Sequence, residues 1–212
     1  MSTLPLVHYH APNTRSMSIR WLFEELGNPA HEQKPLNLSK GDHKTPWYMA
    51  INPMGKVPTV VHGGTVITEA AAIALYLADL YPKAGLAPKI GDPARGTYLR
   101  WIIFNQAAVE PAVTDLALKR EPGSPGMMSY GTYDATIDAL TGALSKGPYI
   151  LGETFSAADV VIGSGVRWML MFKLLPQRHE FTSYAERLSQ RPALQRAIAK
   201  DKELAATQAG SS

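Results

Sequence analysis

The segment Asn52-Pro-Met-Gly-Lys-Val-Pro-Thr59 leads into two short β-type runs, Thr59–His62 and Thr65–Thr68, on either side of Gly63-Gly64. Two extended runs joined by a Gly-Gly pair predict a β-hairpin with a two-residue turn. The following run, Glu69–Leu80, repeats its large apolar residues at helical spacing, which predicts a helix. The stretch therefore predicts an antiparallel sheet edge followed by a helix.

The residues before this stretch predict alternating strand and helix. Leu4–His10 and His31–Leu36 are strand candidates, and Arg15–Leu26 between them has apolar residues at i, i+3, i+4 and i+7. A strand, a helix and a strand in this order usually form a right-handed parallel unit. With a short helix over Lys44–Ile51 and Thr68 as the candidate cap of the next helix, the expected order is βαβαββα, an α/β domain.

The composition changes near residue 82, where nearly all later segments become helical in pattern. The segment Pro82–Pro93 contains three prolines and two glycines, which is typical of a linker. We expect one domain over residues 1–82, a linker over 83–92 and an all-α domain over 93–212. A capping box, Ser156-Ala-Ala-Asp159, marks one helix start. The expected helices of this part cover residues 93–120, 126–144, 156–172, 181–190 and 192–206.

Composition excludes several classes of function. The 212 residues contain no cysteine, so disulfides, thiolate metal sites and a cysteine nucleophile are excluded. A net charge of +3 without blocks of like charge argues against nucleic-acid or membrane-surface binding. We expect no metal, because His8 and His10 share a strand face without an evident third ligand. The sequence shows no secretory leader and no run of 18 apolar residues, so a cytoplasmic protein is expected.

Five segments together carry a resemblance to a known family. They are Ala11-Pro-Asn-Thr-Arg-Ser16, Ile19–Gly27, Asn52–Thr59, Thr68-Glu-Ala-Ala-Ala-Ile73 and Gly152–Asp159. In this order and spacing they resemble the glutathione S-transferase superfamily, in particular soluble, bacterial-type members that use no cysteine. The resemblance covers nearly the whole chain. It implies a thioredoxin-like domain followed by an all-α domain, a role in detoxification, and a homodimer.

The resemblance also implies a glutathione site. A cis peptide bond between Val57 and Pro58 would let the main chain of Val57 pair with the cysteinyl part of glutathione. Glu69 would bind the γ-glutamyl amine, where a carboxylate is the natural partner. The family usually has Ser or Thr next, but Ala70 stands here and keeps only its backbone N–H. The cations expected at the glycyl carboxylate are His43, Lys44 and Lys56.

Catalysis of this kind requires a donor that stabilises the glutathione thiolate. The loop before the first helix offers Thr14, Asn13 and Ser16, in that order of preference, close to the positive end of the helix dipole. The alternative is that all three only cap the helix. The serine characteristic of serine-type relatives is not preserved at this place.

An apolar second substrate is expected to bind to aromatic and methionine side chains of the helical domain. The candidates are Trp101, Phe104, Asn105, Met127, Tyr130, Trp168 and Phe172, although such residues on helices more often belong to a core. The sequence therefore predicts transfer of glutathione to an apolar electrophile. Alternatives are a glutathione-dependent peroxidase, an ether-cleaving or isomerising enzyme, and a binding protein of the same fold without catalysis.

Overall fold

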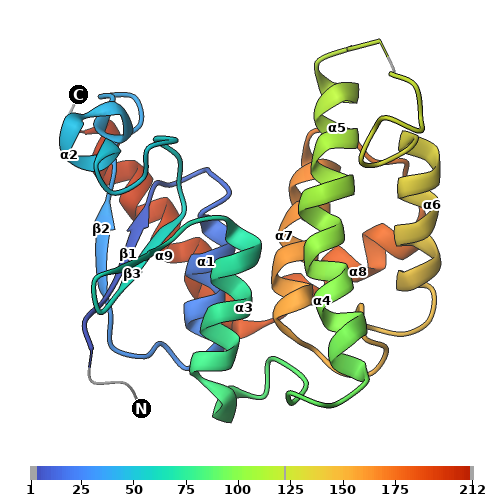
Figure 1. The fold of residues 1–212 in the computed structure, drawn as a ribbon, viewed down its shortest axis with the longest axis horizontal. Helices are drawn as coiled ribbons and strands as arrows, with labels where there is room; N and C mark the ends of the chain where they lie inside the picture. The colour runs from blue at the N-terminus through green and yellow to red at the C-terminus, as the bar shows by residue number, and fades with distance from the viewer. Residues whose placement is uncertain (1–3, 122, 211–212) are drawn as a thin grey trace. The chain divides into compact units, whose positions relative to one another are not determined.

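The computed structural model describes residues 4–121 and 123–210, which form two compact units (Figure 1). The first unit contains the described residues up to Ala84 together with those from Arg191 onward. The second unit extends from Gly85 to Gln190. This division differs from the predicted one, because the last helix was expected in the helical domain and belongs to the first unit.

The first unit is built on a four-stranded mixed sheet in the order β2-β1-β3-β4. Strand β1 (Leu6–His10) runs parallel to β2 (Glu32–Pro35) and antiparallel to β3 (Thr59–His62). Strand β4 (Thr65–Ile67) is antiparallel to β3 and follows a turn in which Gly63 and Gly64 both have positive φ. The predicted hairpin and the thioredoxin-like βαβαββα order are therefore confirmed.

Helices α1, α3 and α9 pack with this sheet (Figure 1). Buried side chains of α1, including Ile19, Leu22 and Phe23, and of α3, including Ile73 and Leu77, form much of the core. The helical elements of this unit are α1 (Met17–Glu25), η1 (Asp42–Lys44), α2 (Pro46–Met49), α3 (Ala70–Leu80), η2 (Pro82–Ala84) and α9 (Pro192–Ala209).

Helix α9 is fastened to α1 by ion pairs. Glu24, whose side chain is almost fully buried, binds Arg196 at 2.7 Å and also Lys200. Glu25 accepts two hydrogen bonds from Arg191, at 2.6 and 2.7 Å. Burial alone would raise the pKa of Glu24, but hydrogen bonds from Lys200 and Arg196 outweigh it and lower the pKa. The Glu24 carboxylate is thus charged and paired, as a buried charge must be.

The second unit is helical, and its core includes Ile102, Val160, Ile162, Phe181 and Tyr184. A π-helical turn, η3, joins α4 to α5. The elements are α4 (Ala94–Phe104), η3 (Asn105–Val109), α5 (Glu110–Ala117), α6 (Tyr133–Leu144), α7 (Ala157–Met171) and α8 (His179–Ser189).

Two predicted helix starts are wrong. Helix α6 begins at Tyr133 rather than near Gly126, because Gly131 has a φ of 68° and the hydroxyl of Thr132 caps the helix by accepting the N–H of Ala135. Helix α3 is preceded by Glu69, not Thr68, as its cap residue, and Glu69 makes no side-chain capping bond. The capping box of α7 is confirmed.

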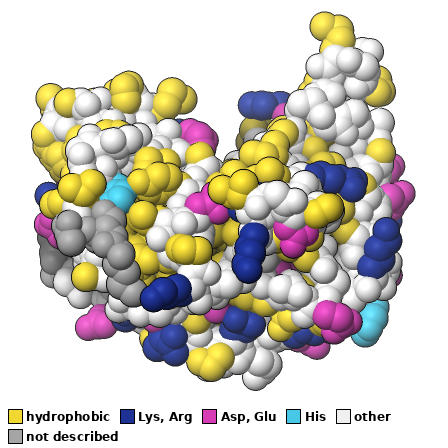
Figure 2. Space-filling view, turned by 60° about the horizontal axis from the view of Figure 1, so that its bottom comes forward, with side chains coloured by type: hydrophobic (Ala, Val, Ile, Leu, Met, Phe, Trp, Pro, Cys, Tyr) yellow, Lys and Arg dark blue, Asp and Glu magenta, His cyan; other side chains and the backbone are white. Residues whose placement is uncertain are grey.

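On the face drawn in Figure 2, cationic and anionic side chains are interspersed, and neither sign forms a continuous block. In the described part of the chain, no helix is long and apolar enough to cross a membrane.

Asp159 should be a main stabilising residue of the second unit. Its buried carboxylate accepts the N–H groups of Ile150 and Ser156 and the hydroxyl of Tyr184, at 2.8 to 2.9 Å. Burial raises its pKa, while these bonds act in the opposite direction. We expect Asp159→Ala to lower the free energy of unfolding by about 3 kcal/mol, because three buried donors lose their acceptor.

Asp134→Ala is the matched control, since Asp134 is an exposed acid in the first turn of α6. In urea titrations of both variants, Asp134→Ala should lower the free energy of unfolding by at most about 0.5 kcal/mol. Equal losses for the two variants would contradict this account of Asp159.

Candidate functional site

The sheet register brings three predicted site segments to one end of the sheet. Tyr9 pairs with Thr59 across β1 and β3, and Val60 pairs with Ile67 across β3 and β4. Strand β1 therefore ends, β3 begins and β4 ends at the same end of the sheet. The β1–α1 loop (residues 11–16), the Val57–Pro58 bond and Glu69 before α3 adjoin these strand ends, so all three extend from one end of the sheet.

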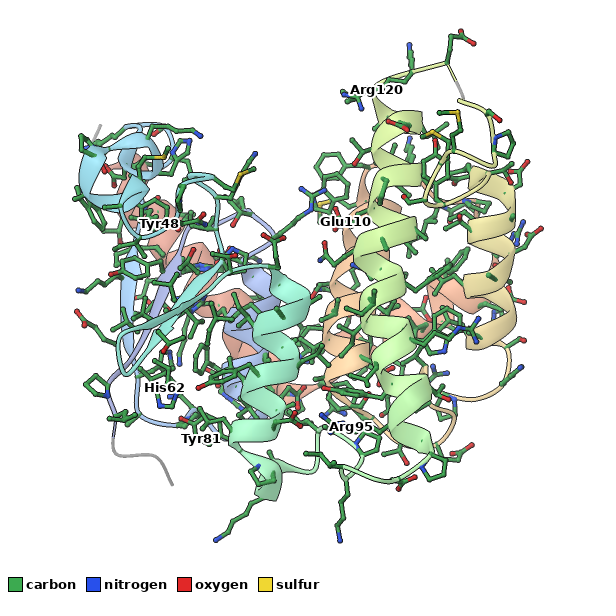
Figure 3. All side chains as sticks on the ribbon, viewed as in Figure 1. Tyr48, His62, Tyr81, Arg95, Glu110 and Arg120 are labelled. Atoms are coloured by element: carbon green, nitrogen blue, oxygen red, sulfur yellow. The ribbon has the colours of Figure 1, made fainter. Side chains whose placement is uncertain are left out.

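The peptide bond between Val57 and Pro58 is cis, as expected from the sequence. The main chain before it is held by two buried side chains that the sequence reasoning did not single out. The hydroxyl of Tyr48 donates to the Lys56 carbonyl at 2.6 Å, and the amide of Asn52 donates to the same carbonyl at 2.9 Å. Tyr48 lies between α2 and the sheet (Figure 3), where burial raises the pKa of its phenol and favours the donating form.

The expected cations lie in two segments that touch. Gly55 has a φ of 57°, and a Cβ there would lie 2.7 Å from the His43 carbonyl and 2.8 Å from Nζ of Lys44. Lys44 itself donates to the Met54 carbonyl at 3.2 Å. Lys56 is exposed in the next position. The structure therefore brings His43, Lys44 and the turn before Lys56 together.

Glu69 and Ala70 lie where the sheet passes into α3. Glu69 is exposed and has a φ of 64° and a ψ of 117°, an unusual conformation for a residue with a side chain. Such conformations cost about 1–3 kcal/mol and are found most often at functional sites. Ala70 is the first residue of α3, so its N–H belongs to the group of free donors at the helix N-terminus.

The three candidate thiol donors have different surroundings. Asn13 is exposed and has a φ of 57°, a left-handed conformation that Asn tolerates. Thr14 is half-buried, and its hydroxyl donates to the Ala11 carbonyl at 2.7 Å. Ser16 is fully buried, and its hydroxyl lies 2.7 Å from Nδ1 of His10. Ser16 therefore faces the protein interior, whereas Asn13 and Thr14 remain within reach of a ligand.

Behind this loop lies a small group of buried histidines. His8 is fully buried, and its ring is tilted against those of His10 and Phe23, with centroid distances of 5.4 and 5.3 Å. Within the described residues, neither ring nitrogen of His8 has a hydrogen-bond partner. Burial, followed by the nearby His10, His31 and Arg20, lowers the pKa of His8 well below 6.5. The described residues contain no group of three or more His, Asp or Glu side chains that could hold a metal ion.

A cavity of about 260 Å³ opens beside the β1–α1 loop. Sequence reasoning missed one of its walls, because that wall comes from α9, far along the chain. The cavity is lined by Ala11, Pro12, Asn13, Asn37, Leu38, Ser39, Ala205, Gln208 and Ala209.

Comparison with known proteins agrees with this architecture. The family model for the N-terminal domain of glutathione S-transferases matches residues 4–79. Glutathione S-transferase 3 from Schizosaccharomyces pombe is 30% identical over 173 residues, which are 73% of this chain and 70% of the relative. The chain belongs to the glutathione S-transferase family.

Solved structures of the family extend the match to both units. A glutathione transferase from Methylococcus capsulatus is 26% identical with a TM-score of 0.78, over 93% of this chain and 98% of that one. A glutathione transferase homologue from Sulfitobacter with bound glutathione is 25% identical with a TM-score of 0.69, over 94% and 99% of the two chains. Members of the glutathione S-transferase family thus share the order of elements described above.

The predicted electrophile-binding residues do not form one exposed group. Trp101 and Asn105 are buried, and Phe104 packs edge-on against Trp101. Of the others, Tyr130 donates to Asp115 at 2.9 Å and Met127 is 87% exposed. Trp168 and Phe172 are both exposed and lie 4.8 Å apart, ring to ring. That last pair is the part of the predicted set in which two aromatic side chains are both exposed and adjacent.

The buried His8 should make the protein sensitive to acid. Its pKa in the folded state is lowered, so below the ordinary value of 6.5 the unfolded chain binds more protons. Stability is therefore fully present above about pH 6.5 and decreases as the pH falls, by up to about 1.4 kcal/mol per pH unit for each such group. We expect His8→Phe, which keeps a ring beside Phe23, to reduce this slope between pH 5 and 7 in urea titrations.

His179→Gln is the control, because His179 is exposed at the start of α8. It should retain the slope of the wild type. A His8→Phe variant with an unchanged slope would contradict the assignment to His8.

Proposed function

We propose that this chain is a glutathione transferase in which the glutathione thiolate attacks an apolar electrophile. The sulfur forms a bond to carbon, and the electrophile either releases a leaving group with its electron pair or takes up a proton. The observation that carries the proposal is the meeting of Val57, Glu69 and the β1–α1 loop at one end of the sheet. It supplies main-chain groups for a peptide, a carboxylate for an amine and donors for a sulfur anion.

Thiol activation is the step that this site has to perform. A free thiol with a pKa of about 8.5 is only about 3% thiolate at pH 7. Lowering the pKa by two units requires about 2.7 kcal/mol of stabilisation of the anion. Donors from Asn13 and Thr14, at the N-terminal end of α1, are suited to this role because they add to the helix dipole. We assign Ser16, which is buried, a supporting role.

The remaining features follow from family membership. We propose glutathione as co-substrate, no metal, a cytoplasmic location and a role in detoxification. We also propose a homodimer, which is supported by exposed apolar side chains on the first unit, among them Trp47, Met54 and Val66. An apolar electrophile would meet side chains of the second unit, with Trp168 and Phe172 as the first candidates.

The pKa of the bound thiol tests the proposal directly. Ultraviolet difference titration of glutathione against pH, with and without protein, reports both binding and ionisation. We expect a pKa at least one unit below that of free glutathione. Asn13→Ala and Thr14→Ala should each raise the bound value, with the larger effect at the main donor, because each removes one group that stabilises the anion.

Two other results would redirect the assignment. Saturable binding without a shifted pKa would favour a peroxidase, an ether-cleaving or an isomerising enzyme over general conjugation. No saturable signal at millimolar glutathione would contradict the proposed site and favour a binding protein of the same fold.

Glu69 should contribute mainly through the γ-glutamyl amine. We expect Glu69→Gln to weaken glutathione binding about tenfold, because a charge-assisted hydrogen bond is lost. For a glutathione analogue that lacks this amine, the variant and the wild type should have equal affinity. Calorimetric titration with both ligands separates the two cases, and an equal loss for both would contradict the assignment.

Ala70→Ser is the complementary variant, since it restores the hydroxyl that the family usually has next to this acid. It should tighten glutathione binding about fivefold, the equivalent of one hydrogen bond of about 1 kcal/mol. Unchanged binding would show that the carboxylate of the γ-glutamyl group lies elsewhere.

A further inference from the structure

Helix α9 brings a carboxylate to the β1–α1 loop from the far end of the chain. One oxygen of Asp201 lies 2.7 Å from Nε2 of His10, and the other accepts the backbone N–H of Asn13 at 3.1 Å. Arg20 on α1 is 3.5 Å from the first oxygen. All these residues belong to the first compact unit. Asp201 thus contacts both the end of β1 and the loop that carries the candidate donors.

The protons in this network can be assigned by elimination. Burial alone would raise the pKa of Asp201, but hydrogen bonds from His10 and the Asn13 N–H outweigh it and lower the pKa, so the carboxylate only accepts. Burial lowers the pKa of His10, which is therefore neutral and carries its proton on Nε2. Nδ1 of His10 is then an acceptor 2.7 Å from the Ser16 hydroxyl, and the Ala11 carbonyl, at 3.0 Å, is a second acceptor for the same proton.

The direction of these bonds also determines where the Thr14 hydroxyl proton points. With its proton directed at one of these two acceptors, Ser16 Oγ accepts the N–H of Ala11 at 3.1 Å and can only accept from Thr14, 2.8 Å away. The other neighbour of Thr14 Oγ1 is the Ala11 carbonyl at 2.7 Å, also an acceptor, while the Ser16 N–H donates to Thr14 at 3.2 Å. The single proton of Thr14 Oγ1 therefore points at the Ala11 carbonyl or at Ser16 Oγ, and the hydroxyl is fixed in place within the loop.

We propose that Asp201 is a positioning residue for thiol activation. It acts through a relay of hydrogen bonds from His10 through Ser16 to Thr14, which fixes the conformation of the β1–α1 loop, and through the Asn13 N–H, which holds that residue in its left-handed conformation. Donors that are already oriented stabilise a developing charge without the cost of reorganising the loop. The inference rests on the proposed transferase function and adds to it a residue from the last helix.

Attachment of α9 does not depend on Asp201 alone. Glu24 binds Arg196 and Lys200, and Glu25 binds Arg191, across the same two helices. The charged and titratable groups around Asp201 are His10 on β1 and Arg20 on α1, with Glu203 near Arg20. Removing the charge at position 201 should therefore disturb the loop while the helix stays in place.

The test compares Asp201→Asn with Arg196→Met in the full-length protein. Asn has the same shape, but its single oxygen cannot accept from both His10 and Asn13. We expect Asp201→Asn to raise the pKa of bound glutathione by about one unit, a roughly tenfold loss of thiolate and of rate below both pKa values. The dissociation constant of glutathione should change less than about twofold, since Val57 and Glu69 are untouched, and the rate should recover at high pH.

Arg196→Met breaks an ion pair between the same helices without touching the relay. It should leave the thiol pKa and the pH profile as in the wild type. Equal shifts in both variants would mean that only the packing of α9 matters, and would overturn the proposal. An unchanged pKa of bound glutathione in Asp201→Asn would also overturn the proposal.

Ser16→Ala tests the relay from its other end and serves if Asp201→Asn does not fold. It should raise the thiol pKa, and the double variant should be less affected than the sum of the two single ones, as expected for residues of one network. A wild-type thiol pKa in Ser16→Ala would overturn the path through His10.

If the wild-type protein itself does not lower the thiol pKa, the proposed function fails and this inference with it. A lowered wild-type pKa that Asp201→Asn leaves unchanged overturns the inference alone.

Discussion

Buried carboxylates between α1 and α9 are the constraint on which the first unit depends. Glu24 and Glu25 on α1 and Asp201 on α9 are all largely removed from solvent. An unpaired charge in such a place costs several kcal/mol, so each carboxylate requires its partner. The partners of Glu24 and Glu25 lie on or next to α9, and those of Asp201 lie on β1 and α1. The last helix is therefore an integral part of the thioredoxin-like unit rather than an addition to it.

The candidate site is made largely of main chain, and this explains its dependence on buried support. Val57, Ala70 and the β1–α1 loop offer backbone groups at one end of the sheet. Buried side chains hold this main chain in place, as Tyr48 and Asn52 do at the Lys56 carbonyl. Precise placement of backbone groups requires such a second set of contacts.

The sequence predicted those parts of the fold that depend on local patterns. Gly63-Gly64 determines a hairpin, and Ser156 with Asp159 determines a helix start, because the residues concerned are neighbours in the chain. The cis bond before Pro58 followed from the motif around it. The predicted start of α6 near Gly126 was wrong because Gly131 has a positive φ and Thr132 caps the helix just before Tyr133. The contacts of Asp201 were missed as well, since periodicity carries no information about residues 191 positions apart.

The return of α9 also sets the order in which the molecule can be completed. Residues Gly85–Gln190 form a continuous unit, whereas the first unit needs residues from both ends of the chain. During synthesis the second unit is available for folding before His10 and Asn13 have met Asp201. Contacts between distant residues form slowly, because a long loop has to close first. The unit that begins first in the sequence is consequently the last whose folding can be finished, because residues as far as Asp201 must leave the ribosome before His10 and Asn13 can meet their partner.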